Sequence, residues 1–265
     1  MKKKFNFSLV LGIVLMSILL LMLLVNLFYQ PCDPNKMDGN AKFQSPSANH
    51  IMGTDNYGRD IYARAVEGLK VTFIVAVSTV AIGLFFGTLL GAFTGYYGGV
   101  IDEVLMRLND ALASFPSILL ALIFVSILGS GKYKIIVSLG IIFIPSFARI
   151  VRSEFIRLKH KDYVKSARLM GASDLRVMFV HMLPNAIPTI LTSVAIGFNN
   201  AVLAESSMSF LGIGVQPPNA SLGRMLSEAK GYIFSAPWAS VFPGLMIVLL
   251  ILSFVLISEG VSENA

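Results

Sequence analysis

The chain has 265 residues, of which 55% are hydrophobic and only 14% are charged, with a mean hydropathy of +0.74. Soluble domains carry about 25% charged residues, so this composition predicts an all-α, polytopic membrane protein. The formal net charge of +6 does not indicate nucleic-acid binding, because basic residues gather at Lys2 to Lys4 and between residues 149 and 176. Such clusters are typical of the cytoplasmic flanks of membrane spans. The single cysteine, Cys32, excludes an internal disulfide and a cysteine-based metal cluster.

The apolar runs predict about six membrane-spanning helices, since about 20 apolar residues are needed to cross a bilayer. The run ending at Phe28 is long for a signal peptide and is followed by no small-x-small cleavage site, so we expect it to remain as the first span. Six spans place both termini in the cytoplasm, in agreement with the N-terminal lysines. The spans are expected at about residues 8–28, 71–95, 112–128, 134–150, 184–211 and 238–257.

Taken in order, the chain divides into three parts: residues 1–69, with the first span and a polar outer segment (residues 30–69), a membrane core over residues 70–260, and a tail over residues 261–265. Within the outer segment, Asp60 and Arg64 are one helical turn apart and form a possible ion pair. A solvated pair of this kind contributes less than about 1 kcal/mol.

Glycines recur at every fourth position of the second predicted span. In a helix this spacing places them on one face, where small residues let another helix approach closely in lipid. We expect the partner helix to lie in the same chain. The glycines are Gly83, Gly87, Gly91 and Gly95.

The polar interval from Arg149 to Pro184 predicts a helix–turn–helix, too short and too charged to span a bilayer. Gly171 ends the first helix, because glycine adopts the left-handed conformation without steric cost. Ser173 with Asp174 then caps a second helix, which Pro184 ends. The predicted apolar faces are Tyr163, Val164, Ala167 and Met170 on the first helix, and Leu175, Met178, Phe179 and Met182 on the second.

By itself this helix–turn–helix pattern fits either of two structures: an amphipathic loop that lies on the membrane surface, or an element that docks on another protein.

In the fifth predicted span, Asn199, Asn200 and Glu205 are the most informative polar residues. A charged group in lipid costs roughly 3 kcal/mol or more, so Glu205 is expected to face protein or water. Two interpretations stay open, a residue that lines a translocation path and a structural group bonded to neighbouring serines.

No catalytic constellation is found in the sequence. The histidines His50, His160 and His181 have neither the spacing nor the carboxylate neighbours of a metal site. The stretch from Gly129 to Lys132 is not a phosphate-binding loop, because Ser126 stands where its first glycine belongs. We therefore expect a protein that is not itself an enzyme and that holds no metal, with any ATP chemistry supplied by a partner.

Lys165-Ser166-Ala167 is followed by Gly171 and then by His181-Met182-Leu183-Pro184. This spacing resembles a cytoplasmic loop of the integral-membrane subunits of binding-protein-dependent ABC importers, with the pattern Glu-Ala-Ala, three residues, Gly, nine residues, Ile, one residue, Leu-Pro. A lysine, Lys165, replaces the acidic residue of that pattern. Identity is limited to Ala167, Gly171, Leu183 and Pro184.

Two more stretches resemble the branch of this family that imports peptides and nickel. One is the run from Gly53 to Asp60, which follows the pattern G-T-D-x-x-G-R-D. The other is the run from Ala204 to Gly212, which is followed by Gln216-Pro217-Pro218. The resemblance covers about residues 50–260.

The resemblance implies a permease subunit that imports dipeptides or oligopeptides through the bacterial cytoplasmic membrane. An alternative within the branch is nickel or metal-chelate uptake, and a self-sufficient secondary transporter or channel is a more remote one. The implied partners are a related permease, two cytoplasmic ATPases that bind ATP and magnesium, and an extracytoplasmic substrate-binding protein. The residues expected to dock on an ATPase are Tyr163, Lys165, Ser166, Ala167, Met170, Gly171, Ala172, Ser173, His181, Leu183 and Pro184.

Overall fold

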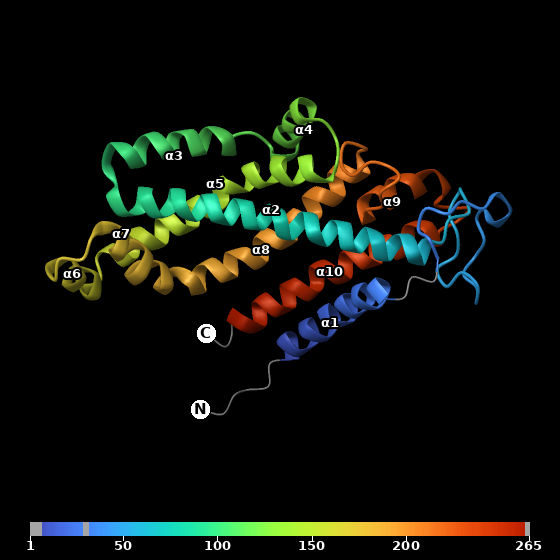
Figure 1. Ribbon diagram of the computed structural model, residues 1–265, viewed down its shortest axis with the longest axis horizontal. Helices are drawn as coiled ribbons and strands as arrows, with labels where there is room; N and C mark the ends of the chain where they lie inside the picture. Colours follow the sequence, from blue (N-terminus) through green and yellow to red (C-terminus); the bar gives the residue numbers. More distant parts are fainter. Residues whose placement is uncertain (1–6, 29–31, 263–265) are drawn as a thin grey trace. The chain divides into compact units, whose positions relative to one another are not determined.

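The computed structural model describes residues 7–28 and 32–262, and every extended regular element in these ranges is a helix (Figure 1). The predicted all-α fold class is confirmed. The long helices are α1 (Phe7–Phe28), α2 (Ile61–Tyr97), α3 (Gly99–Ala113), α4 (Ser117–Leu128), α5 (Lys132–Lys159), α8 (Leu183–Phe210) and α10 (Trp238–Ser262). The short elements are α6 (Asp162–Leu169), α7 (Asp174–Arg176), α9 (Leu222–Ala229), a π-helical segment (Val177–Met182), and 3-10 turns at Gly39–Ala41 and Lys230–Tyr232.

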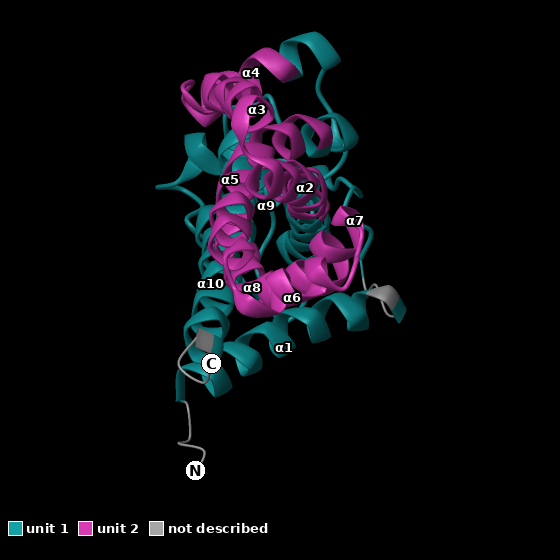
Figure 2. Cartoon of the chain, turned by 90° about the vertical axis from the view of Figure 1, so that its left-hand side faces the viewer, with its two compact units in different colours: residues 1–77, 125–136, 198–265 teal, residues 78–124, 137–197 magenta. Residues whose placement is uncertain are grey.

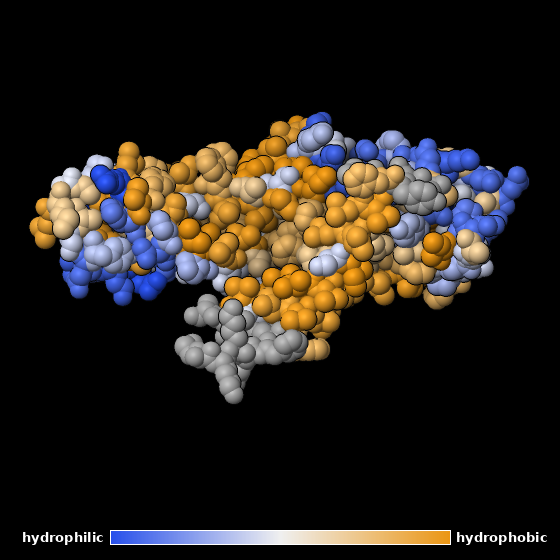
Figure 3. Space-filling view, turned by 60° about the horizontal axis from the view of Figure 1, so that its bottom comes forward, coloured by the Kyte–Doolittle hydropathy of each residue, from blue (hydrophilic) through white to orange (hydrophobic). Residues whose placement is uncertain are grey.

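Five helices are long and apolar enough to cross a membrane, and the spans number six if α3 and α4 together count as one broken span. The third span, expected at about residues 112–128, is not one continuous helix, because α3 ends at Ala113 and α4 begins at Ser117 and leaves it at 90°. Pro116 explains the break, since proline has no backbone N–H and disfavours a helical conformation at the residue before it. Apolar side chains cover the long helices on the face drawn in Figure 3, as contact with lipid requires.

Two helices extend beyond the predicted spans. α2 begins at Ile61, ten residues before the apolar run that marks the second span, and α5 continues to Lys159. The first part of the interval from Arg149 to Pro184 is therefore the end of α5. Hydropathy marks where a helix enters lipid, whereas hydrogen bonding continues the helix into the flanking polar residues.

The chain forms two compact units (Figure 2). Unit 1 comprises residues 1–77, 125–136 and 198–265, and unit 2 comprises residues 78–124 and 137–197. In unit 1, α1 packs closely against α10. A Cβ atom on Gly12 would lie 2.8 Å from the backbone nitrogen of Ile257, so only glycine permits this approach.

In unit 2 the glycines of α2 lie against α5. A Cβ atom on Gly91 would lie 2.4 Å from the carbonyl oxygen of Ala148, and one on Gly95 would lie 2.7 Å from that of Arg152. Gly83 and Gly87 similarly approach Phe143 and Phe147. The two backbones therefore pack at close range along about three turns of α2.

Candidate functional sites

The helix–turn–helix segment, residues 162–182, lies in unit 2 and turns at Gly171. Gly171 has φ +82°, and its N–H donates to the carbonyl of Arg168 at 2.9 Å. The N–H of Ala172 donates to the carbonyl of Ala167 at 3.1 Å, which completes the hydrogen-bond pair of a Schellman motif. Ser173 occupies the N-cap position of α7, although its side chain makes no capping bond. The predicted turn and its glycine are therefore found at the expected positions.

One face of this segment is fully buried in the core of unit 2. Val164, Met178 and Met182 have no exposed surface, and they belong to a cluster that includes Phe155 of α5 and Ala92 of α2. Burial of this size fixes the segment to the spanning helices that surround it, because each buried aliphatic side chain contributes roughly 1.5–3 kcal/mol.

The opposite face is exposed and carries apolar side chains among polar ones, which differs from the predicted pattern. Met170, at the C-cap of α6, is 87% exposed, and Leu175 is 56% exposed, so neither belongs to a buried face. Leu169 beside them is 89% exposed. Lys165 pairs with Asp162 at 3.1 Å on the surface. Partial burial raises the pKa of the Tyr163 hydroxyl above its ordinary value.

The expected helix end at Pro184 is wrong. The chain passes through the π-helical segment directly into α8, with Pro184 as the second residue of that helix. The N–H of Leu183 donates to the carbonyl of Met178, five residues back, and the side-chain amide of Asn185 donates to the carbonyl of His181 at 2.7 Å. Pro184 has no N–H to donate to a helical carbonyl, and the wider π turn tolerates this missing hydrogen bond, so the helix continues.

A second polar cluster surrounds Glu205, which is fully buried in unit 1. Its carboxylate accepts hydrogen bonds from Thr72 at 2.8 Å and from Ser209 at 2.7 Å, with Ser206 at 3.5 Å. Both interpretations of Glu205 therefore meet a definite geometry, in which hydroxyl groups of the protein bond the carboxylate.

The two asparagines of the same span differ from Glu205 and from each other. Asn200 is exposed, and Asn199 is partly buried. The side-chain oxygen of Asn199 is buried and has no hydrogen-bond partner among the residues that the structure describes. A buried polar atom without a partner is uncommon in a folded protein, so Asn199 stays a candidate site residue.

The outer segment holds an ion-pair network that the sequence did not predict. Arg59 pairs with Asp55 at 2.6 Å and with Glu228 of α9 at 2.7 Å, and Glu228 also pairs with Arg64 at 3.3 Å and with Arg224 at 3.1 Å. Arg59 and Arg64 are 4% and 1% exposed, so these charges are buried, whereas the sequence led us to expect solvated charges in this segment. The spacing of Arg224 and Glu228, four residues apart, was the local signal that could have revealed part of the network.

The expected pair of Asp60 with Arg64 is also wrong. Asp60 precedes the first residue of α2, and its carboxylate accepts a hydrogen bond from the N–H of Ala63 at 2.8 Å, as an N-cap does. Its other oxygen lies 2.8 Å from the ring nitrogen of His50. Asp60 thus fixes the start of α2, while Arg64 points to Glu228.

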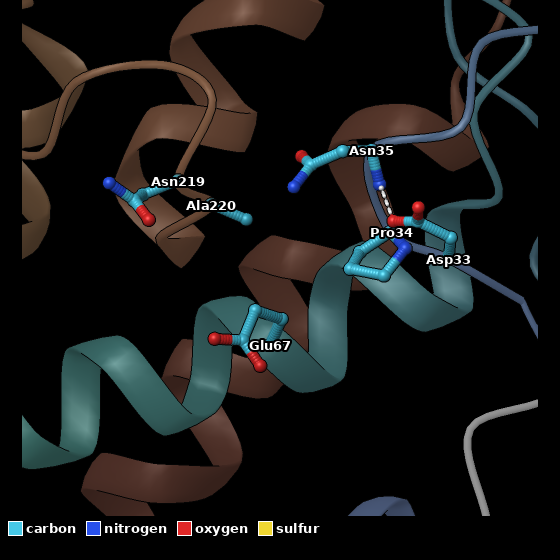
Figure 4. Close-up of a pocket in the computed structure, with 6 residues that line it drawn as sticks. All are labelled: Asp33, Pro34, Asn35, Glu67, Asn219 and Ala220. Carbon is cyan, nitrogen blue, oxygen red and sulfur yellow. Dashed lines mark hydrogen bonds between the residues drawn. The ribbon is translucent and has the colours of Figure 1, made fainter.

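A polar pocket of about 480 Å³ opens on unit 1 beside this network (Figure 4). Its wall is drawn from the outer segment, from α2 and from the residues before α9. The nearby guanidinium of Arg64 orients Asn35, whose side-chain oxygen it approaches at 3.3 Å. The lining residues are Asp33, Pro34, Asn35, Glu67, Asn219 and Ala220.

These features define a multi-pass helical membrane protein with a helix–turn–helix segment that exposes apolar side chains at its tip. The chain belongs to the family described as binding-protein-dependent transport system inner membrane components, which it matches over residues 87–263. It is accordingly a permease subunit of an ABC importer and a multi-pass protein of the inner membrane. It is not itself an enzyme.

Relatives from several bacteria extend the comparison over most of the chain. The dipeptide transport system permease protein DppC of Alkalihalophilus pseudofirmus is 40% identical over 84% of this chain and 73% of its own length. The protein of the same description from Haemophilus influenzae is 34% identical over 98% of this chain and 90% of its own. The glutathione transport system permease protein GsiD of Pectobacterium atrosepticum is 38% identical over 86% and 76%.

Solved structures resemble this fold at lower identity. An inward-facing structure of the MetNI methionine ABC transporter has a TM-score of 0.57 at 21% identity and covers 75% of this chain and 93% of its own. A crystal structure of an amino acid ABC transporter with histidines has a TM-score of 0.59 at 17% identity and covers 76% and 94%. These likenesses show the shared fold.

Proposed function

We propose that this permease subunit imports peptides, with dipeptides or oligopeptides as the substrate class. The relatives that cover most of its length are named for dipeptide, peptide and glutathione transport. Glutathione is itself a small peptide, so these names agree in chemistry. The nickel or metal-chelate alternative has no comparable support among these relatives.

The working complex combines this chain with a related permease subunit, two cytoplasmic ATPases that bind ATP and magnesium, and an extracytoplasmic substrate-binding protein. Both termini then lie in the cytoplasm of a bacterial cell, as does the helix–turn–helix segment. The description of the family, binding-protein-dependent transport, supports a binding protein as a partner.

The observation that carries the mechanism is the two-sided character of the helix–turn–helix segment. Its inner face, with Val164 and Met178, is fully buried among spanning helices, whereas Leu169 and Met170 at its tip are almost fully exposed. An exposed apolar tip on a rigid base is suited to docking in a groove of a partner. Closure of the ATPases on binding ATP then moves this segment, and the helices packed on it tilt to change access to the path.

The translocation path is assigned to a different set of residues. Glu205 is fully buried and bonded to three hydroxyl groups, so we assign it a structural role. Asn199 and Asn200 remain the path candidates of this span, since Asn200 is exposed and the buried oxygen of Asn199 lacks a partner among the described residues.

The test of docking uses Gly171→Asp and Ala167→Trp in the assembled importer. Both variants should insert normally, but peptide uptake and the stimulation of ATP hydrolysis by the loaded binding protein should be lost. Gly231→Ala is the matched control, because nothing lies within 4 Å of a Cβ atom at that position. Peptide uptake at the normal rate in both variants would exclude docking through this turn.

A further inference from the structure

Tyr96 lies near the end of α2, is 3% exposed, and contacts three separate parts of unit 2. Its hydroxyl donates a hydrogen bond to the carboxylate of Asp174, the first residue of α7. The guanidinium carbon of Arg168 in α6 lies 4.7 Å from the centroid of its ring, and the ammonium of Lys159 at the end of α5 lies 5.9 Å away. One side chain therefore connects α2 with both arms of the helix–turn–helix segment.

The chemistry of this contact makes it directional. A buried phenol requires a partner for its hydroxyl, and the Asp174 carboxylate supplies one of the stronger, charge-assisted kind. The face of the ring attracts cations, so Arg168 and Lys159 are held against it. Ser173, the N-cap residue of α7, makes no side-chain capping bond, so the position of this turn depends more heavily on Asp174.

The end of α2 that carries Tyr96 is itself firmly held. A Cβ atom on the preceding residue, Gly95, would lie 2.7 Å from the Cβ of Phe155, so α2 and α5 are in close contact there. Just beyond, Asp102 of α3 accepts two hydrogen bonds of 2.6 Å from Arg152 of α5. A force on the helix–turn–helix segment therefore meets a rigid helix end at Tyr96.

We propose that Tyr96 is a positioning residue for energy coupling: its bond to Asp174 and its contact with Arg168 hold the helix–turn–helix segment at a fixed orientation to α2. Movement of the segment is then passed to α2 and is not dissipated by bending of the loop. This inference rests on the proposed function. In this inference Tyr96 determines how efficiently ATP hydrolysis drives peptide import, and it takes no part in binding the ATPase.

The test is Tyr96→Phe in the complete importer reconstituted in liposomes, with radiolabelled dialanine and a radiolabelled tripeptide as the probes. The variant removes the hydroxyl and keeps the ring that faces the cations. ATP hydrolysis should persist, while the amount of peptide imported for each ATP hydrolysed should fall about tenfold to a hundredfold, as loss of one buried hydrogen bond to a charged group predicts. The control is Tyr97→Phe, because Tyr97 is 43% exposed and stacks on Phe93.

Variants of the acceptor separate positioning from simple structural support. Asp174→Asn keeps a neutral oxygen that can accept from Tyr96 and should lose clearly less than Asp174→Ala, which should match Tyr96→Phe. The double variant Tyr96→Phe/Asp174→Ala should be no worse than either single variant, because all three lose the same bond. A wild-type ratio in Tyr96→Phe, or additive losses in the double variant, would overturn the proposal.

Gly171→Asp distinguishes failure of this inference from failure of the proposed function. Loss of uptake in Gly171→Asp together with a wild-type ratio in Tyr96→Phe would remove the role of Tyr96 and leave docking intact. Normal uptake in Gly171→Asp would remove docking through this turn, and the role of Tyr96 with it.

Discussion

The hydroxyl of Thr72 in α2 donates a 2.8 Å hydrogen bond to the carboxylate of Glu205 in α8. The same hydroxyl oxygen accepts a hydrogen bond from the backbone N–H of Leu222 at 3.4 Å. In the same way, the hydroxyl oxygen of Ser209 accepts one from the backbone N–H of Val215 at 3.1 Å. Because these backbone groups use an acceptor position of each hydroxyl, the hydroxyl protons are directed at Glu205. The carboxylate thus joins α2, α8 and the start of α9 within unit 1.

Replacement of Glu205 should therefore affect stability before it affects transport. In Glu205→Ala the buried hydroxyls of Thr72 and Ser209 lose their acceptor, and the free energy of unfolding should fall by roughly 2–4 kcal/mol. Glu205→Gln keeps one acceptor oxygen and should lose less than half as much. Thermal unfolding of the purified importer measures both. A Glu205→Gln protein with the wild-type melting temperature and no peptide uptake would place Glu205 in the path instead.

The ion-pair network of the outer segment gives a second prediction. Glu228→Gln removes the charge that faces Arg59 and Arg64, whose side chains are 5% and 2% exposed. Breaking a buried pair leaves uncompensated charge and costs about 3–5 kcal/mol, so residues 32–60 should become open to proteolysis and the melting temperature should drop.

The matched control is Glu67→Gln in the same unit. Glu67 pairs with Lys70 at 3.3 Å, but their side chains are 28% and 49% exposed, so the loss should stay below about 1 kcal/mol. Equal effects of Glu228→Gln and Glu67→Gln on proteolysis would show that the buried network does not hold the outer segment.

The exposed tip of the helix–turn–helix segment should separate folding from docking. Leu169→Glu and Met170→Glu change side chains that are 89% and 87% exposed, so the melting temperature of the chain should hardly change. The ATPase should nevertheless be recovered poorly with the variant permease on affinity purification, because a charge is then placed in an apolar contact. Val164→Glu, at a fully buried position of the same helix, should instead prevent stable folding. Full ATPase recovery with both tip variants would contradict docking through this face.

The contrast between Gly171 and Pro184 shows what the sequence could predict. Gly171 was predictable because a left-handed residue after a helix is a local requirement that glycine meets best. The prediction that the second helix ends at Pro184 was wrong. The buried side chains of Met178 and Met182 stabilise a π turn, through which the helix continues past the proline. Tertiary packing of this kind leaves no local signal.

Other predictions succeeded or failed according to how far apart in sequence the interacting residues are. The four-residue spacing of glycines in α2 indicates a close helix contact, and the structure supplies α5 as the partner in unit 2. Arg64 was matched to Asp60 because that residue is near in sequence, whereas its partner Glu228 lies 164 residues away. Ion pairs of buried groups follow the fold, so a single sequence without the fold favours the wrong neighbour.

The last prediction concerns glycine-to-alanine changes where helices of unit 2 pack closely. The loss of stability depends on which atom the new methyl group would meet. At Gly91 a Cβ atom would lie 2.4 Å from the backbone oxygen of Ala148, which cannot rotate away, whereas at Gly197 it would meet the tip of the Phe147 ring at 2.7 Å. Gly91→Ala should therefore force α2 away from α5 and lose at least about 1–3 kcal/mol of unfolding free energy, and Gly197→Ala should lose less. Thermal unfolding of the two variants beside Gly231→Ala measures the order, and equal melting temperatures for all three would contradict close backbone packing at Gly91.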